Sequence, residues 1–166
     1  MSNYTRNRTP GGTWFFTCCL RDRRSALLTE QIDVLRDAVR GAKASAPFDI
    51  DCFVVLPDHL HAIWTLLQGD SDYPGRWKSI KGRFSRGLGA RSDLAPAARR
   101  PREKGVWQNR YWEHRIRDDA DLAAHLRYCY LNPVKHGLVK SPIEWPHSSL
   151  QRDVAMGRIP SDWDGL

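Results

Sequence analysis

Long hydrophobic runs are missing from this 166-residue sequence. No stretch approaches the roughly 18 apolar residues that a membrane-spanning helix needs. The first residues, MSNYTRNRTPGG, are polar and contain no apolar segment of the kind found in secretory signals. We therefore expect a soluble, cytoplasmic protein without a membrane partner, and its length suits a single domain over residues 1–166.

Cysteine is scarce as well, with only 4 in the chain. These residues show neither the C-x-x-C spacing of many zinc and redox sites nor the density of a secreted disulfide scaffold. The sequence argues against both classes. We expect reduced thiols in the core, at Cys18, Cys19, Cys52 and Cys129.

Basic residues are abundant, and their excess is concentrated in one segment. Residues 76–117 contain 13 Lys and Arg against 3 Asp and Glu, a local net charge of +10 that leaves −3 for the rest of the chain. Five aromatic residues are interleaved with these cations. Cations that neutralise phosphates, together with rings that stack on bases, are typical of proteins that bind nucleic acid, particularly single strands. A solvated basic surface over core aromatics is the alternative.

Hydrophobic periodicity and turn residues predict an alternating order of strands and helices. The expected strands are 13–20, 48–57, 59–67 and 106–117, and the expected helices are 29–44, 75–88 and 119–132. We expect Thr29 to cap the first helix and Asp118 the last, which should end before Pro133. The order β-α-β-β-α-β followed by a helix is the ferredoxin-like pattern, an α+β fold with an antiparallel sheet.

Two segments show no clear periodicity. Residues 89–105 are rich in Pro, Ala and Arg, which predicts a mobile basic loop. Residues 141–166 are rich in turn residues and contain tryptophans that look exposed. We expect this C-terminal tail to pack back over the domain.

The stretch VVLPDHLHAIW places His59 and His61 one residue apart in an apolar run. In a strand, residues i and i+2 point to the same face, so the two imidazoles would stand side by side. A pair of neighbouring imidazoles is half of a metal site. The alternative is that both histidines merely occupy the open face of a half-buried strand.

The helix predicted after Asp118 carries a polar stripe beside its apolar one. His125, Tyr128 and Asn132 follow the spacing i, i+3 and i+7, which keeps them on one side of a helix. The tyrosine could act as a nucleophile, and the amide oxygen of Asn132 could bind a hard cation held by the two histidines. Each residue also has an ordinary structural explanation, as a boundary tyrosine or as the last helical residue before a proline.

These features resemble a known family. The segments GGTWFFT, LPDHLHAIW, VWQNRYWEHRIRDDADLAAHLRYCYLNPVKHGLV and WPHSS occur in the order seen in the REP-associated tyrosine transposases, a branch of the HUH single-strand DNA nucleases. The resemblance implies that His59 and His61 form the His-hydrophobic-His motif and that Tyr128 is the nucleophile. Tyr130 is the alternative nucleophile, but only Tyr128 fits the spacing of the family's Y-x-x-x-N-P motif. Asn132 is the implied third metal ligand.

The resemblance also implies a reaction and a substrate. Tyr128 would attack a DNA phosphate to leave a 5′-phosphotyrosine and a free 3′-hydroxyl, and a second strand could reverse this step. The implied cofactor is Mg²⁺ or Mn²⁺, and the implied partner is single-stranded hairpin DNA from repetitive extragenic palindromes (REP), bound in the nucleoid. Family precedent favours a monomer. His125 is either a proton relay for Tyr128 or a surface histidine.

We expect the basic segment to hold the backbone of the hairpin. The candidate DNA-binding residues are Arg76, Lys78, Lys81, Arg83, Arg86, Arg99, Arg100, Arg102, Lys104 and Arg110. Three other functions stay open from the residues alone. A zinc hydrolase would need a third His, Cys or acidic ligand at suitable spacing, an RNA-binding domain would normally carry an aromatic RNP signature, and a domesticated palindrome-binding protein would bind without cleaving.

Overall fold

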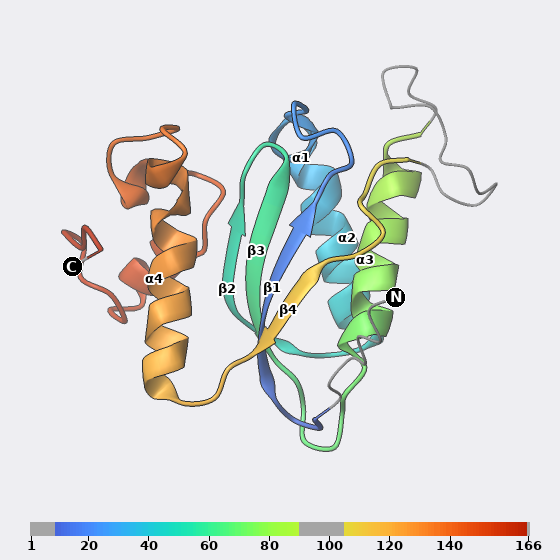
Figure 1. The fold of residues 1–166 in the computed structure, drawn as a ribbon, viewed down its shortest axis with the longest axis horizontal. Coiled ribbons are helices and arrows are strands. Elements are labelled where there is room, and N and C mark those ends of the chain that lie inside the picture. The colour runs from blue at the N-terminus through green and yellow to red at the C-terminus, as the bar shows by residue number, and fades with distance from the viewer. Residues whose placement is uncertain (1–8, 90–104, 166) are drawn as a thin grey trace, which may run out of the picture.

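An antiparallel sheet of four strands forms the centre of the computed structural model, which describes residues 9–89 and 105–165 (Figure 1). The elements in chain order are β1 (Thr13–Cys19), α1 (Leu27–Glu30), α2 (Ile32–Ser45), β2 (Asp49–Val55), β3 (His59–Thr65), α3 (Tyr73–Gly87), β4 (Trp112–Arg115), α4 (Asp119–Lys135), the 3-10 turn η1 (Pro142–Glu144) and α5 (Leu150–Ala155). The strand order is β2-β3-β1-β4. This order and the alternation of elements confirm the α+β, ferredoxin-like prediction.

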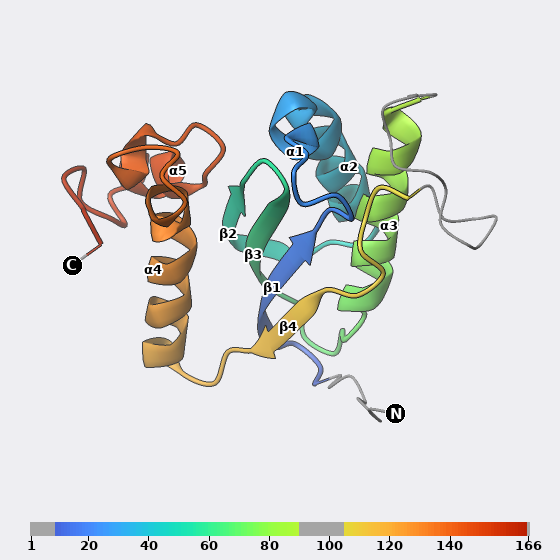
Figure 2. The same ribbon diagram turned by 45° about the horizontal axis from the view of Figure 1, so that its top comes forward.

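The two faces of the sheet are covered by different helices (Figures 1 and 2). Alternation along β3 sends Leu60 and Trp64 into the core beneath α2 and α3, and sends Ile63 into a second core beneath α4. The second core also contains Phe15 of β1. Because His61 lies two residues before Ile63, it belongs to the α4 face of the sheet.

The helix boundaries differ from the prediction at two starts. Thr29 does not cap the long helix, because its hydroxyl and its amide both donate to the Ala26 carbonyl within the short helix α1. The long helix α2 begins afterwards, behind Gln31, without a side-chain cap. Helix α3 begins earlier than expected, because the Asp72 carboxylate accepts a hydrogen bond from the Gly75 amide and caps it.

The end of α4 corrects the prediction that Pro133 terminates this helix. The helix continues through Pro133 to Lys135. The following turn is closed by backbone bonds that include the one from the His136 amide to the Asn132 carbonyl, and Gly137 then adopts a φ of 70°. A positive φ favours glycine, so the helix stops at a glycine end rather than at the proline. The predicted cap at Asp118 is confirmed, since its carboxylate accepts from the Asp121 amide.

The C-terminal tail packs over the domain as predicted, but its tryptophans are not exposed. Trp145 and Trp163 are partly buried against the second core, and the Trp145 indole donates to the Val55 carbonyl. The last strand, β4, is shorter than expected. Of the predicted basic loop at 89–105, residues 90–104 lie outside the described part of the chain.

Two expectations from composition can be compared directly with the structure. All four cysteines are unpaired, as predicted, and three are buried, while Cys19 is half-buried. Within the described residues, no helix has both the length and the apolar character needed to cross a membrane.

Candidate active site

His59 and His61 stand together on β3, on the face that α4 covers. The two rings have centroids 5.1 Å apart, and the side chains are almost fully buried, with exposures of 4% and 2%. The prediction that strand alternation brings them together is confirmed. They are not decoration on an open strand face, because they are buried under a helix.

Each of these imidazoles is fixed through its Nδ1 atom. His59 Nδ1 lies 2.7 Å from a carboxylate oxygen of Asp58, and His61 Nδ1 lies 2.8 Å from the hydroxyl of Thr17 on the neighbouring strand β1. Partners of this kind orient a metal-binding histidine and leave its Nε2 available. The sequence analysis missed Asp58 and Thr17. The turn preceding the strand signals Asp58, whereas Thr17 follows only from strand pairing.

Asn132 brings an amide oxygen to the same place. It is 1% exposed, and its Nδ2 atom lies 3.5 Å from the Tyr128 carbonyl oxygen. Asn132 Oδ1 and His61 Nε2 are both buried and neither has a partner in hydrogen-bond geometry, although, against the lowering by burial, the Asn132 side chain is close enough to His61 to raise the pKa of its ring. Buried polar atoms left in this way are costly, and a cation bound between them would satisfy both. The donor set therefore fits a metal ion.

Burial keeps both imidazoles in the form that binds metals. It lowers the pKa of His61 to about 3, and the neighbouring His59 acts in the same direction. Burial also lowers the pKa of His59, although the Asp58 carboxylate opposes this effect. Both rings are consequently neutral at pH 7, as a metal ligand must be.

Tyr128 and Tyr130 have opposite surroundings. Tyr128 is 43% exposed, and its ring centroid lies 5.1 Å from that of His61. The Tyr130 side chain is 1% exposed, and its hydroxyl donates to Asp153 and lies 3.1 Å from the Ser149 hydroxyl. Burial raises the pKa of Tyr130 far above its usual range. Tyr130 thus has the environment of a core residue, and Tyr128 has that of a reactive one.

A third histidine, which the sequence analysis missed, lies next to His59. The ring centroid of His136 is 5.1 Å from that of His59. His136 follows the last turn of α4, four residues after Asn132, and is exposed. This spacing places it one turn from a predicted ligand, which was a usable signal in the sequence.

His125 belongs to a separate cluster and is not an isolated surface histidine. Its ring stacks on His114 of β4, with centroids 4.6 Å apart, and its Nδ1 atom lies 2.8 Å from the Asp121 carbonyl oxygen. The Asp121 carboxylate is also bonded to His114 and Arg117, and these contacts, with that from His114 the largest, hold its pKa well below its usual range. Among the described residues, this is the one group of His and acidic side chains close enough to share a metal ion. The Asp121 carboxylate already accepts a hydrogen bond from Arg117. The cluster is therefore better explained as a structural contact that holds β4 against α4.

The predicted DNA-binding residues are only partly available. The prediction that Arg76 binds DNA was wrong. Its side chain is 3% exposed, pairs with Asp70, and donates to the Ala46 and Pro47 carbonyls. It stabilises the loop before β2 and cannot contact DNA. Exposed positions are found for Lys78, Arg83, Arg86 and Arg110, while Arg99, Arg100, Arg102 and Lys104 lie outside the described residues.

Several of these cations line a hollow of about 560 Å³ between α3 and residues 105–111. Lys78, Lys81 and Arg86 are among its lining residues, together with the aromatic rings of Trp107 and Tyr111. The Lys81 ammonium lies 5.7 Å from one ring centroid and 5.3 Å from the other. Trp107 is buried and Tyr111 is half-buried, and both pack with the core beneath α2 and α3, so around this hollow the structure favours the alternative of a basic surface over core aromatics.

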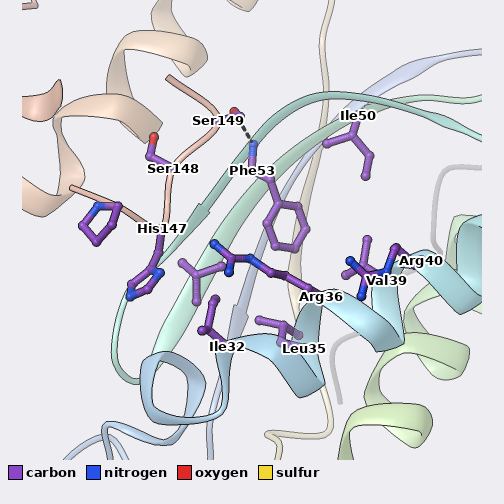
Figure 3. Close-up of a pocket in the computed structure, with 12 residues that line it drawn as sticks. Ile32, Leu35, Arg36, Val39, Arg40, Ile50, Phe53, His147, Ser148 and Ser149 are labelled. Carbon is purple, nitrogen blue, oxygen red and sulfur yellow. Dashed lines mark hydrogen bonds between the residues drawn. The ribbon is translucent and has the colours of Figure 1, made fainter. Parts of the chain in front are cut away.

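A second hollow, of about 270 Å³, lies between α2, β2 and residues 146–149 (Figure 3). Phe53 forms part of its apolar lining, and Arg36 and Arg40 extend over it from α2 (Figure 3). Because Phe53 packs with the core beneath α2 and α3, this hollow is on the opposite face of the sheet from His61. No pattern in the sequence predicted this hollow.

Comparison with known proteins identifies relatives over nearly the whole chain, although no protein-family model matches it. The chain is 48% identical over 165 residues to a REP-associated tyrosine transposase of Escherichia coli, covering 99% of this chain and 92% of the relative. It is 44% identical over 166 residues to a putative REP-associated tyrosine transposase of Haemophilus influenzae, covering 99% and 94%.

Solved structures agree with this relationship. A REP-associated tyrosine transposase bound to a REP hairpin superposes with a TM-score of 0.88 at 48% identity, covering 98% of this chain and 91% of that one. A putative transposase from Deinococcus radiodurans, 19% identical over 76% of this chain and 95% of its own, has a TM-score of 0.50 and supports the fold alone. With such identity over almost its entire length, the chain belongs to the REP-associated tyrosine transposases.

Proposed function

We propose that this protein is a transposase that binds REP-type hairpins in single-stranded DNA, and that it cleaves and rejoins the strand through a covalent bond to Tyr128. One observation carries the proposal. The exposed phenol of Tyr128 lies beside the buried imidazole of His61, where His61 Nε2 and Asn132 Oδ1 are both left without hydrogen-bond partners. The proposed nucleophile, Tyr128, therefore lies directly beside His61, one of the proposed metal ligands.

The metal ligands in this proposal are His59, His61 and Asn132, and the ion is Mg²⁺ or Mn²⁺. When bound, such an ion would offset negative charge on the scissile phosphate. The protein's own contribution is to hold the two rings through Asp58 and Thr17, so that the donor atoms are oriented before DNA arrives.

The covalent step balances without a nucleotide cofactor. The Tyr128 oxygen forms a bond to phosphorus as the bond between phosphorus and the 3′-oxygen breaks, and the phenolic proton ends on that 3′-oxygen. The Lys135 ammonium lies 5.7 Å from the Tyr128 ring centroid and brings a positive charge to this side of the site. We propose His125, one turn earlier, as a proton relay through its Nε2 atom, in addition to its part in the contact between β4 and α4. A 3′-hydroxyl from another strand reverses the reaction and rejoins the DNA.

The substrate follows from the relative and from the basic surface. The related transposase with a TM-score of 0.88 was solved with a REP hairpin. In this chain, the hollow beside α3 is lined by Lys78, Lys81 and Arg86, cations that suit the phosphate backbone of such DNA. We propose a monomer that acts on DNA at the nucleoid.

The deciding experiment traps the covalent intermediate. Wild-type protein is incubated with labelled REP-type hairpins and Mg²⁺, and a denaturation-resistant adduct should form on Tyr128, as located by mass spectrometry. Tyr128→Phe should bind the hairpin without forming the adduct, whereas the matched variant Tyr130→Phe should still form it. An adduct on Tyr130 would replace the assigned nucleophile. Hairpin binding without an adduct on any tyrosine would instead indicate a palindrome-binding protein that does not cleave.

A further inference from the structure

Trp112 is an outlier among the seven tryptophans of the chain. Its side chain is 67% exposed, the largest exposure among the big hydrophobic residues that the structure describes. Four other tryptophans are buried in the core, and Trp145 and Trp163 are partly buried against it. An isolated exposed tryptophan needs no explanation in itself, but the position of this one is specific.

The pairing of the strands places Trp112 in line with the candidate active site. Thr17 of β1 pairs with His61 on one side and with Trp112 on the other. Directly paired residues of an antiparallel sheet point to the same face. Trp112 therefore stands on the face that carries His61, two strands away, a separation of about 10 Å at the usual strand spacing.

Among the described residues, little covers the sheet at Trp112 itself, although α4 contacts β4 two residues further on, where His125 stacks on His114. Helix α4 packs on β2 and β3, while β4 forms the opposite edge of the sheet (Figures 1 and 2). Tyr128 projects from α4 toward His61 and is itself 43% exposed. An exposed phenol and an exposed indole thus lie on either side of the same stretch of sheet surface.

The surroundings carry positive charge. Arg110, two residues before Trp112, is exposed, and the Lys135 ammonium lies against the Tyr128 ring. Cations beside flat, solvent-facing rings are the arrangement that single-stranded nucleic acid selects, because phosphates pair with the cations and bases stack on the rings. A purely apolar partner would leave these charges without a counterpart.

We propose that Trp112 is the stacking platform for an unpaired base of the strand that Tyr128 cuts, and that it positions this strand across the sheet. The inference rests on the proposed function and adds a specificity-determining contact to it. The occupant is one nucleobase in a single-stranded arm next to the hairpin. Trp112 would contribute to binding of the arm and not to binding of the paired stem.

The test is a binding cycle that combines protein and DNA variants, measured in EDTA so that cleavage does not interfere. The DNA is a REP-type hairpin with single-stranded arms, in which abasic sites are placed one position at a time. Trp112→Ala should bind the intact DNA about 5- to 100-fold more weakly, the usual range for one base stacked on an aromatic ring. One abasic position should weaken the wild type by a similar factor and should not weaken Trp112→Ala further.

Two protein controls accompany the cycle. Trp112→Phe keeps an aromatic ring and should retain most of the affinity. Met156→Ala removes another large exposed apolar side chain, which is 60% exposed and belongs to the tail after α5, and should leave affinity unchanged. Equal losses for Trp112→Ala on hairpins with and without arms would overturn the proposal. A change of oligomeric state on light scattering would also overturn it, by assigning Trp112 to contact between copies of the chain.

The outcome can be separated from that of the proposed function. Coupling between Trp112 and one arm position, without any tyrosine adduct in the wild type, supports the stacking role while refuting cleavage. An adduct on Tyr128 with no coupling at any arm position supports cleavage and refutes the stacking role.

Discussion

The ring of Tyr128 meets the ring of His61 edge-on, with centroids 5.1 Å apart and planes inclined at 71°. The two residues come from different layers, since one lies on a helix and the other on a strand beneath it. Because Tyr128 and His61 lie on separate elements, substitutions can test the proposed nucleophile and the proposed metal ligands separately.

Removing either imidazole should abolish metal-dependent cleavage while preserving DNA binding. We expect His59→Ala or His61→Ala to lower the cleavage rate by at least ~100-fold, because loss of a ligand should exceed the effect of losing an outer partner. Hairpin affinity should change little, since the basic surface holds the backbone. His147→Ala, on the opposite side of the sheet, is the control. Full activity of a double His59, His61 variant, or undiminished cleavage in excess EDTA, would remove the metal from the mechanism.

Thr17 should matter through His61. Thr17→Val preserves shape and strand propensity but removes the hydroxyl bonded to His61 Nδ1, so we expect Mn²⁺ affinity and cleavage to fall ~10- to 100-fold. Thr13→Val is the matched control, because its hydroxyl lies on the same strand but bonds to Thr65 at 2.8 Å. Isothermal titration with Mn²⁺ alone gives a readout that does not depend on DNA. Equal losses in both variants would indicate a general effect on β1.

Asp121 predicts a particular pH dependence of stability. Its contacts with His114 and then Arg117 hold its pKa below the usual value, so its stabilising contribution is complete above about pH 4, the ordinary carboxyl value, and is lost as the pH falls through the lowered one. Asp121→Asn should therefore lower the melting temperature at pH 7, and the difference from wild type should shrink toward pH 3. Asp119→Asn, an exposed position in the same helical turn, should show no such convergence. A constant difference across the pH range would contradict the assignment.

Salt should reveal which surface holds the DNA backbone. Replacing Lys78, Arg86 and Arg110 with glutamine should make the slope of log affinity against log salt shallower by about two units, because each single-strand phosphate contact contributes ~0.7. The matched triple replaces Arg24, Arg36 and Arg40, which removes the same charge from α2 and from the segment before α1. If only this second triple changes the slope, the hollow of Figure 3 is the DNA surface.

The parts of the site that lie within one element could be predicted from the sequence. The pairing of His59 with His61 needs only strand alternation, and the common face of Tyr128 and Asn132 needs only helical periodicity. Both patterns are short-range and survive without knowledge of the fold. The choice between Tyr128 and Tyr130 came from the resemblance to the family's Y-x-x-x-N-P motif, and the different burial of the two side chains is consistent with it.

The parts that depend on contacts between elements could not be predicted. Thr17 reaches His61 only through the register of two strands 44 residues apart in the chain. Arg76 looked like one more cation of a basic segment, and only the tertiary structure shows its guanidinium bonded to three carbonyls and to Asp70. Pro133 is a general helix-ending signal that the closing bonds of the next turn override here.

The two hydrogen bonds of the Tyr130 hydroxyl help to fix the orientation of helix α4, which also carries Tyr128. They tie the middle of α4 to Ser149 and to Asp153 of α5, so the helix cannot turn about its axis without breaking them. The direction in which the Tyr128 phenol faces therefore depends on Ser149 and Asp153, which contact the opposite side of α4 through Tyr130. Substitutions at Tyr130, Ser149 or Asp153 should therefore change the orientation of Tyr128 while leaving every proposed reacting group in place.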